Sequence, residues 1–141
     1  MLAISKAKAY LCDLPVASPR TDAMQAFLKQ ETVFVEIETA DGASGLGYSY
    51  TIGTGGSAVL ELLEGYLLVQ VIGEDASRPE ALWQKVRDST RATMIGPITT
   101  LALAAIDIAA WDLRARALGA PLWQIAGGAQ EEVPLYDTEG G

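Results

Sequence analysis

Residues 98–123 read ITTLALAAIDIAAWDLRARALGAPLW and contain the strongest structural signal in the chain. The first 21 of them are apolar apart from two threonines, two aspartates and two arginines, and Gly119-Ala120-Pro121 then ends the run. This pattern predicts one long helix, Ile98 to Leu118. We expect Ile98, Leu101, Ala105, Ile108 and Trp111 along one side, with alanines thinning the others so that neighbours can approach. Such a helix packs inside a bundle or against a second body.

Two aspartates interrupt this helix, and their surroundings differ. Asp112 precedes Arg116 by four residues, which is the favourable spacing for an ion pair on a helix surface. Asp107 has apolar neighbours on both sides in sequence, and a buried carboxylate needs hydrogen bonds or a cation. Two roles stay open for Asp107: a structural carboxylate that holds a loop or caps a neighbouring helix, which we favour, or a catalytic acid.

The first half of the chain predicts an antiparallel sheet. Thr32 to Thr39 alternates apolar and polar residues, Asp41-Gly42 is a tight-turn signal, and Leu46, Tyr48 and Tyr50 continue into a return strand. Leu2 to Leu11 adds a third strand. We expect Asp13 to Thr21 to form a loop, because two prolines and a serine break any period there.

Two further helices are predicted between the sheet and the long helix. One runs from Ser57 to Gly73, and the second opens at Arg78-Pro79-Glu80 and stops at Gly96-Pro97. The fold class is therefore α+β, a three-stranded antiparallel meander with a three-helix bundle. A short strand, Val133 to Asp137, follows and has no partner strand in the chain.

Composition excludes several functions. The chain has 141 residues, half of them apolar, and a net charge of −8 without a basic cluster, so nucleic acid is an unsuitable partner. No apolar run is long enough for a membrane span, and the amino terminus lacks a signal-peptide pattern. The single cysteine, Cys12, fits an inert packed thiol and a cytoplasmic location. Without histidine, neither a catalytic triad nor a zinc site can be built, and we assign no catalytic and no metal-binding residue.

One short motif offers a rival reading. Gly53 to Ala58 fits the glycine pattern G-x-G-x-x-A between a strand and a helix, with Glu74-Asp75 about twenty residues further on, as in dinucleotide-binding folds. The preceding strand alternates, whereas the first strand of a doubly wound fold is a continuous apolar run. A parallel sheet with helices on both faces would favour the dinucleotide reading.

The carboxyl-terminal motifs resemble a known family. Ala105 to Leu113, Leu118 to Leu122 and Gly127-Gly128 look like the end of the amino-terminal domain of the mandelate racemase and muconate lactonizing enzyme branch of the enolase superfamily. Val33 to Tyr50 resembles the strand, Asp-Gly turn and Gly-x-Gly-Tyr segment of that domain. The resemblance implies a capping domain at residues 1–128 and the first strand of a (β/α) barrel at 129–141.

The resemblance also implies a function. Family members abstract a proton α to a carboxylate with the help of Mg²⁺ held by the barrel, so we expect part of an acid-sugar dehydratase or racemase that has no turnover by itself. The capping domain would form the substrate-specificity lid from Pro15 to Phe27 and Tyr48 to Gly56. The implied substrate-binding residues are Arg20, Tyr50 and Thr138.

The expected partners are a carboxylate-bearing small molecule, the carboxyl-terminal barrel of the same protein, and further copies in a homo-oligomer. A hypothesis from another class is a non-catalytic binding module whose helix Ile98 to Leu118 docks a partner protein. Continuation of the sequence into alternating strands and helices, with acidic residues at strand ends, would favour the enzyme.

Overall fold

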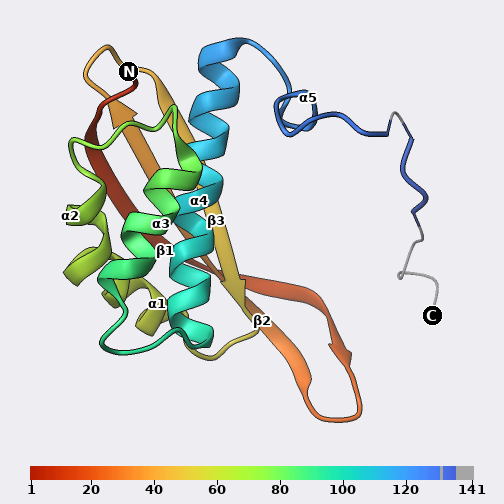
Figure 1. Cartoon of the computed structure of the whole chain (residues 1–141). Helices are drawn as coiled ribbons and strands as arrows, with labels where there is room; N and C mark the ends of the chain where they lie inside the picture. Colours follow the sequence, from red (N-terminus) through yellow and green to blue (C-terminus); the bar gives the residue numbers. More distant parts are fainter. Residues whose placement is uncertain (131, 136–141) are drawn as a thin grey trace.

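The computed structural model describes residues 1–130 and 132–135. Three strands come first and helices follow, in two layers (Figure 1). In order, the elements are β1 (Ile4–Thr21), β2 (Ala26–Thr39), β3 (Ser44–Thr51), α1 (Gly56–Leu62), the π-helical turn η1 (Leu63–Leu67), α2 (Leu68–Val71), α3 (Pro79–Ser89), α4 (Pro97–Leu118) and α5 (Leu122–Ile125). The predicted α+β fold is confirmed.

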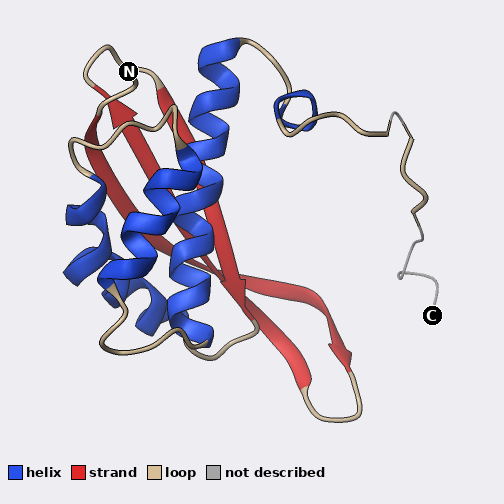
Figure 2. Ribbon diagram, viewed as in Figure 1, coloured by secondary structure: helices blue, strands red, loops and turns tan. Residues whose placement is uncertain are grey.

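The sheet is an antiparallel meander in the order β1-β2-β3, and the helices from α1 to α4 cover one of its faces, whereas α5 lies apart from it (Figure 2). Val33, Val35 and Ile37 of the central strand are fully buried against the helices. The alternate residues form an open face, where Tyr10, Phe34 and Tyr48 lie side by side across the three strands. Because both strand pairs of this sheet are antiparallel, the sheet excludes the doubly wound fold that the dinucleotide reading requires.

The predicted loop from Asp13 to Thr21 is wrong, because these residues continue β1 and pair with an extended β2. Pro15 lies opposite Lys29, and Arg20 lies opposite Phe27 beyond a register shift. β1 is an edge strand, and a proline is tolerated there because its missing N–H can face solvent instead of a neighbouring strand. The two strands form an exposed hairpin arm, residues 13–29, which projects past the helices (Figure 1).

The buried face of α4 also differs from the prediction. Ile108 is 39% exposed, and Ile98, Leu101 and Trp111 are only partly buried. The residues in the core are instead mostly small: Thr99, Ala102, Leu103, Ala105, Ile106, Ala109, Ala110, Leu113 and Ala115. The alanines face inward because α4 lies unusually close to β3.

That close approach depends on two glycines of β3. A Cβ atom added at Gly47 would lie 2.0 Å from the Ala105 carbonyl oxygen, and one at Gly45 would lie 2.2 Å from the Ala109 carbonyl oxygen. No other residue type fits between the strand and the helix backbone. The contact presses α4 directly onto the sheet, with Leu103, Ile106 and Leu113 buried, and Ile108 remains exposed. The binding-module hypothesis therefore loses the inner face of this helix as a docking surface.

The other two predicted helices begin within one residue of the expected positions, but the second is shorter than predicted. The first predicted helix is present as α1, η1 and α2, and Gly73 with φ +83° follows it. α3 begins at Pro79, as expected, but it ends at Ser89 and does not continue to the predicted stop at Gly96-Pro97. Residues 133–135 of the predicted last strand belong to no helix or strand, and Tyr136 and Asp137 lie outside the described residues. The proposed domain boundary at 128/129 therefore stays a prediction.

Candidate functional site

A hollow of about 470 Å³ lies along the hairpin arm and extends to the segment that follows β3. It is formed by residues from both predicted lid segments and from the strand between them: Val16, Ala17, Ser18, Arg20, Phe27, Lys29, Gln30 and Ile52. Two of these side chains are cations, Arg20 and Lys29, while Phe27 and Ile52 supply apolar surface. Arg20 suits an anionic group of a small molecule, and Phe27 and Ile52 suit its apolar part.

Lys29 belongs to a small charge network on β2. Its Nζ lies 3.2 Å from Asp13 Oδ2 across the arm and 3.3 Å from Glu31 Oε1 on the same strand. The hydrogen bonds to Asp13 and Glu31 raise the pKa of Lys29 above its usual value. Lys29 therefore stays protonated and partly neutralised, whereas its aliphatic stem packs beneath Gly53.

Glu31 is a carboxylate only 9% exposed, and it bonds to the segment after β3. The Thr51 hydroxyl donates to Glu31 Oε2 (2.7 Å), and the Gly56 N–H donates to the same oxygen (3.0 Å). These bonds, with that from Thr51 the largest influence, hold the pKa of Glu31 below its usual value. The carboxylate therefore remains ionised near neutral pH.

The predicted substrate-binding residues fall in different places. Arg20 lines the hollow, and Ile52 does so from the second lid segment. Tyr50 pairs with Thr32, is 55% exposed, and is not one of the side chains that form the hollow. Thr138 lies outside the described residues. The structure thus brings Arg20 together with the second lid segment but not with Tyr50, and all three substrate-binding roles stay predictions.

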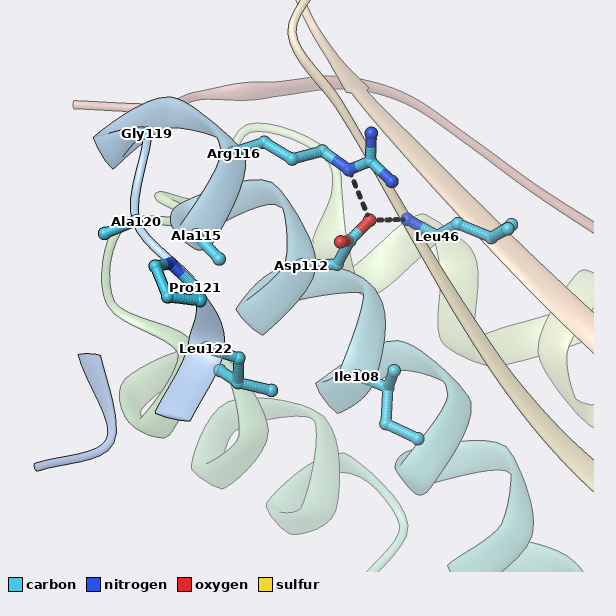
Figure 3. Close-up of a pocket in the computed structure, with 9 residues that line it drawn as sticks. All are labelled: Leu46, Ile108, Asp112, Ala115, Arg116, Gly119, Ala120, Pro121 and Leu122. Carbon is cyan, nitrogen blue, oxygen red and sulfur yellow. Dashed lines mark hydrogen bonds and ion pairs between the residues drawn. The ribbon is translucent and has the colours of Figure 1, made fainter. Parts of the chain in front are cut away.

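A second hollow, of about 400 Å³, lies where α4 ends and the chain turns into α5 (Figure 3). Asp112 Oδ2 accepts hydrogen bonds from the Leu46 N–H (2.9 Å) and from Arg116 Nε (2.8 Å). The predicted Asp112–Arg116 pair is confirmed, and the carboxylate also fastens α4 to the outer edge of β3. The rest of the wall is mainly apolar, so this hollow offers packing surface and little chemistry.

Asp107 faces α3 in a third, smaller hollow of about 220 Å³ that it shares with Glu80, Trp83 and Trp111. Burial raises the pKa of Asp107, and the negative charge of Glu80 adds to the effect. The hollow shares no side chain with the one at the arm. Neither of the two roles considered for Asp107 is tested by this position, so both stay predictions.

The glycine segment Gly53 to Ala58 binds a carboxylate of its own chain. The Gly56 N–H, which a dinucleotide site would direct at a phosphate, donates to Glu31. Asp75, the candidate ribose-binding acid, accepts from the Leu2 N–H (2.7 Å) and from the Ser77 N–H (3.0 Å). Both groups therefore have structural roles, and the dinucleotide reading is wrong.

Within residues 1–130 and 132–135, no three potential metal ligands among acidic, histidine and cysteine side chains come together. In the same part of the chain, none of the helices has the length and apolar character needed to traverse a bilayer.

Comparison with known proteins identifies the fold. Residues 6–127 match the model of the mandelate racemase / muconate lactonizing enzyme, N-terminal domain. The chain belongs to this family. It is similar to 3,6-anhydro-alpha-L-galactonate cycloisomerase of Streptomyces coelicolor (36% identity over 134 residues) and to L-talarate/galactarate dehydratase of Salmonella typhimurium (29% over 140 residues). The alignments cover 94% and 95% of the chain but only 37% and 35% of these relatives, so the chain spans little more than a third of their length.

Solved structures agree with the mandelate racemase and muconate lactonizing enzyme assignment. The crystal structure of L-talarate dehydratase from Polaromonas sp. JS666, complexed with Mg and L-glucarate, superposes with a TM-score of 0.89 at 32% identity. The match covers 99% of this chain and 39% of that one. The resemblance seen in the sequence is therefore confirmed, as is the capping-domain fold.

Two residues near the hollow escaped the sequence analysis. Lys29 and Glu31 lie just before the alternating segment that marks β2, in a stretch without a clear period. Glu31 meets Thr51 and Gly56, which are 20 and 25 residues away in sequence. No local sequence pattern can predict a contact between residues that are so far apart in sequence. The sole available signal was a charged residue directly before an alternating strand.

Proposed function

We propose that this chain forms the capping domain of a Mg²⁺-dependent acid-sugar dehydratase or racemase and acts as its substrate-specificity lid. The observation that carries the proposal is the hollow in which Arg20 of the arm and Ile52 of the second lid segment meet. The names of the relatives, a 3,6-anhydro-alpha-L-galactonate cycloisomerase and an L-talarate/galactarate dehydratase, support a sugar acid as the substrate.

The residues of this chain would bind and enclose the substrate. Arg20 would form a charge-assisted hydrogen bond to an anionic group of the sugar acid, while Phe27 and Ile52 would exclude water from that end of the molecule. A bound Mg²⁺ would supply positive charge beside the carboxylate group whose α-proton is removed. The described residues do not fit a Mg²⁺ site, so we assign the metal ligands and the proton-transferring groups to a following barrel.

We further propose that the domain works next to that barrel, in a cytoplasmic homo-oligomer. The outward side of α4 supports a covering partner, because Ile108 is 39% exposed and Trp123 on α5 is 54% exposed. The barrel of the same protein is the first candidate to cover this surface, and a second copy is the other.

The test uses the intact protein that contains this chain. Incubation with a panel of sugar acids in D₂O with Mg²⁺, followed by NMR, should reveal exchange of the α-proton or formation of a dehydrated product. Arg20→Ala should raise KM about tenfold or more and leave kcat nearly unchanged, because a binding contact is lost while the proton-transfer groups are intact. The control is Arg91→Ala, which changes an exposed arginine after α3. An unchanged KM for every substrate turned over would refute the role of Arg20, and no exchange with any acid would refute the function.

A further inference from the structure

Glu31 lies where the two lid segments and the sheet meet. Its side chain is nearly buried on β2, and one of its oxygens, Oε2, accepts both the Thr51 hydroxyl at 2.7 Å and the Gly56 N–H at 3.0 Å. The other oxygen, Oε1, lies 3.3 Å from Lys29 Nζ. A single carboxylate therefore contacts the end of β3, the start of α1 and the root of the arm.

The segment between those contacts needs such a support. Residues 52–55 join β3 to α1 and include Gly53 and Gly55, both with positive φ (+96° and +97°). Because glycine permits many backbone conformations, this segment would sample many of them without the Glu31 hydrogen bonds. Fixing it in one conformation therefore costs conformational entropy. The Glu31 bonds fix the residue on each side of the segment. The fit is close, since a Cβ at Gly56 would lie 2.8 Å from the Glu31 Cβ.

We propose that Glu31 is a positioning residue that ties the second lid segment to the root of the hairpin arm and so sets the shape of the substrate hollow. Ile52 follows Thr51 directly and Lys29 pairs with the carboxylate, and both line the hollow beside Arg20. Glu31 itself is not among the lining side chains, so it acts through its partners. The catalytic link rests on the proposed function, whereas the tie between the segments does not.

Three variants of the intact protein separate the contacts. Glu31→Ala removes all of them, and Glu31→Gln keeps an oxygen for Thr51 and Gly56 but loses the charge that faces Lys29. Thr51→Val removes one donor at similar volume, so that the proposal stays testable if Glu31→Ala folds poorly. The matched control is Glu38→Ala on the same strand, which breaks an exposed ion pair with Lys6 (2.8 Å).

Hydrogen exchange measures the tie itself. In Glu31→Ala, the amides of residues 52–56 should exchange about tenfold faster or more, because a charge-assisted bond to the Gly56 N–H is lost. Thr51→Val should show a smaller increase, and Glu31→Gln and the Glu38→Ala control should stay close to wild type. Unchanged exchange at Gly56 in Glu31→Ala and Thr51→Val would overturn the proposal.

Kinetics measures the consequence for binding. A hollow that has lost its fixed shape should raise KM about tenfold in Glu31→Ala with kcat within about twofold, and Glu31→Gln should recover most of the loss. A fall in kcat at unchanged KM would indicate loss of folded enzyme and would overturn the positioning role. If the wild-type protein turned over no sugar acid, the proposed function would fail, whereas faster exchange in Glu31→Ala would still uphold the tie.

Discussion

Replacement of Gly47 by alanine should separate α4 from the sheet. The added Cβ would lie 2.0 Å from the Ala105 carbonyl oxygen and 2.4 Å from the Ala109 nitrogen, and both are backbone atoms that cannot rotate away. To restore even a tight contact of about 3 Å, the helix must withdraw by about 1 Å. A gap of that size forfeits about a quarter to a half of the dispersion energy along the contact.

We therefore expect Gly47→Ala to cost about 3 kcal/mol or more, at or above the upper end for overpacked cores. At about 2–4 °C per kcal/mol, the apparent Tm should fall by roughly 6–12 °C. Scanning calorimetry of the intact protein, followed in parallel by circular dichroism, measures this shift.

The matched control is Gly65→Ala in η1, where the nearest atom to the added Cβ is Glu61 Oε1 at 3.6 Å. That change should be neutral or stabilise the protein by up to about 1 kcal/mol, since alanine favours helix. If Gly47→Ala melted within about 2 °C of the wild type, the argument that backbone contact holds α4 on β3 would be refuted.

Three further outcomes are expected. Because Thr51 and the Gly56 N–H hold the pKa of Glu31 below its ordinary value of 4.5, its contribution to stability is complete above that pH and is lost as pH falls through the lower folded-state pKa. Glu31→Gln should flatten the acid side of a denaturant-midpoint curve, and an unchanged curve would contradict this. Asp112→Ala should cost about 1–2 kcal/mol in urea unfolding, because the Leu46 N–H loses its acceptor, while Asp112→Asn costs less. An isolated polypeptide of residues 1–141 should be marginal or self-associate, and a monodisperse, cooperatively melting monomer in sedimentation and calorimetry would disprove it.

Much of the fold could be predicted from local patterns. The alternation from Val33 to Ile37, the Asp41-Gly42 turn and the prolines that open α3 and α4 each act within a few residues, and the structure agrees with them. The predictions failed where a contact with a residue distant in sequence determines the local structure. Residues 13–21 are extended because β2 pairs with them, in spite of two prolines. The inner face of α4 is rich in alanine because Gly45 and Gly47 lie beneath it.

The candidate site was predicted only in part, again because some of its contacts join residues that are distant in sequence. Arg20 could be placed because family resemblance assigned its segment, and the structure puts it in the hollow. Tyr50 lies on the open face of the sheet, as the alternation along its strand predicts. That alternation gives the side a residue faces, but it does not show whether the side chain contacts a ligand. Lys29 and Glu31 could not be singled out, since their importance comes from contacts with Asp13, Thr51 and Gly56.

The projection of the hairpin arm has a consequence for evolution. Residues 18–26 are exposed, and the turn at the tip is closed locally, with Asp22 Oδ1 accepting from the Met24 and Gln25 N–H groups. Substitutions at such positions usually change stability by no more than about 0.5 kcal/mol. The tip can therefore acquire new side chains with little penalty to folding, whereas positions under α4 tolerate almost none. Under the lid role proposed above, selection for a new substrate would act on the arm while the rest of the domain is inherited unchanged.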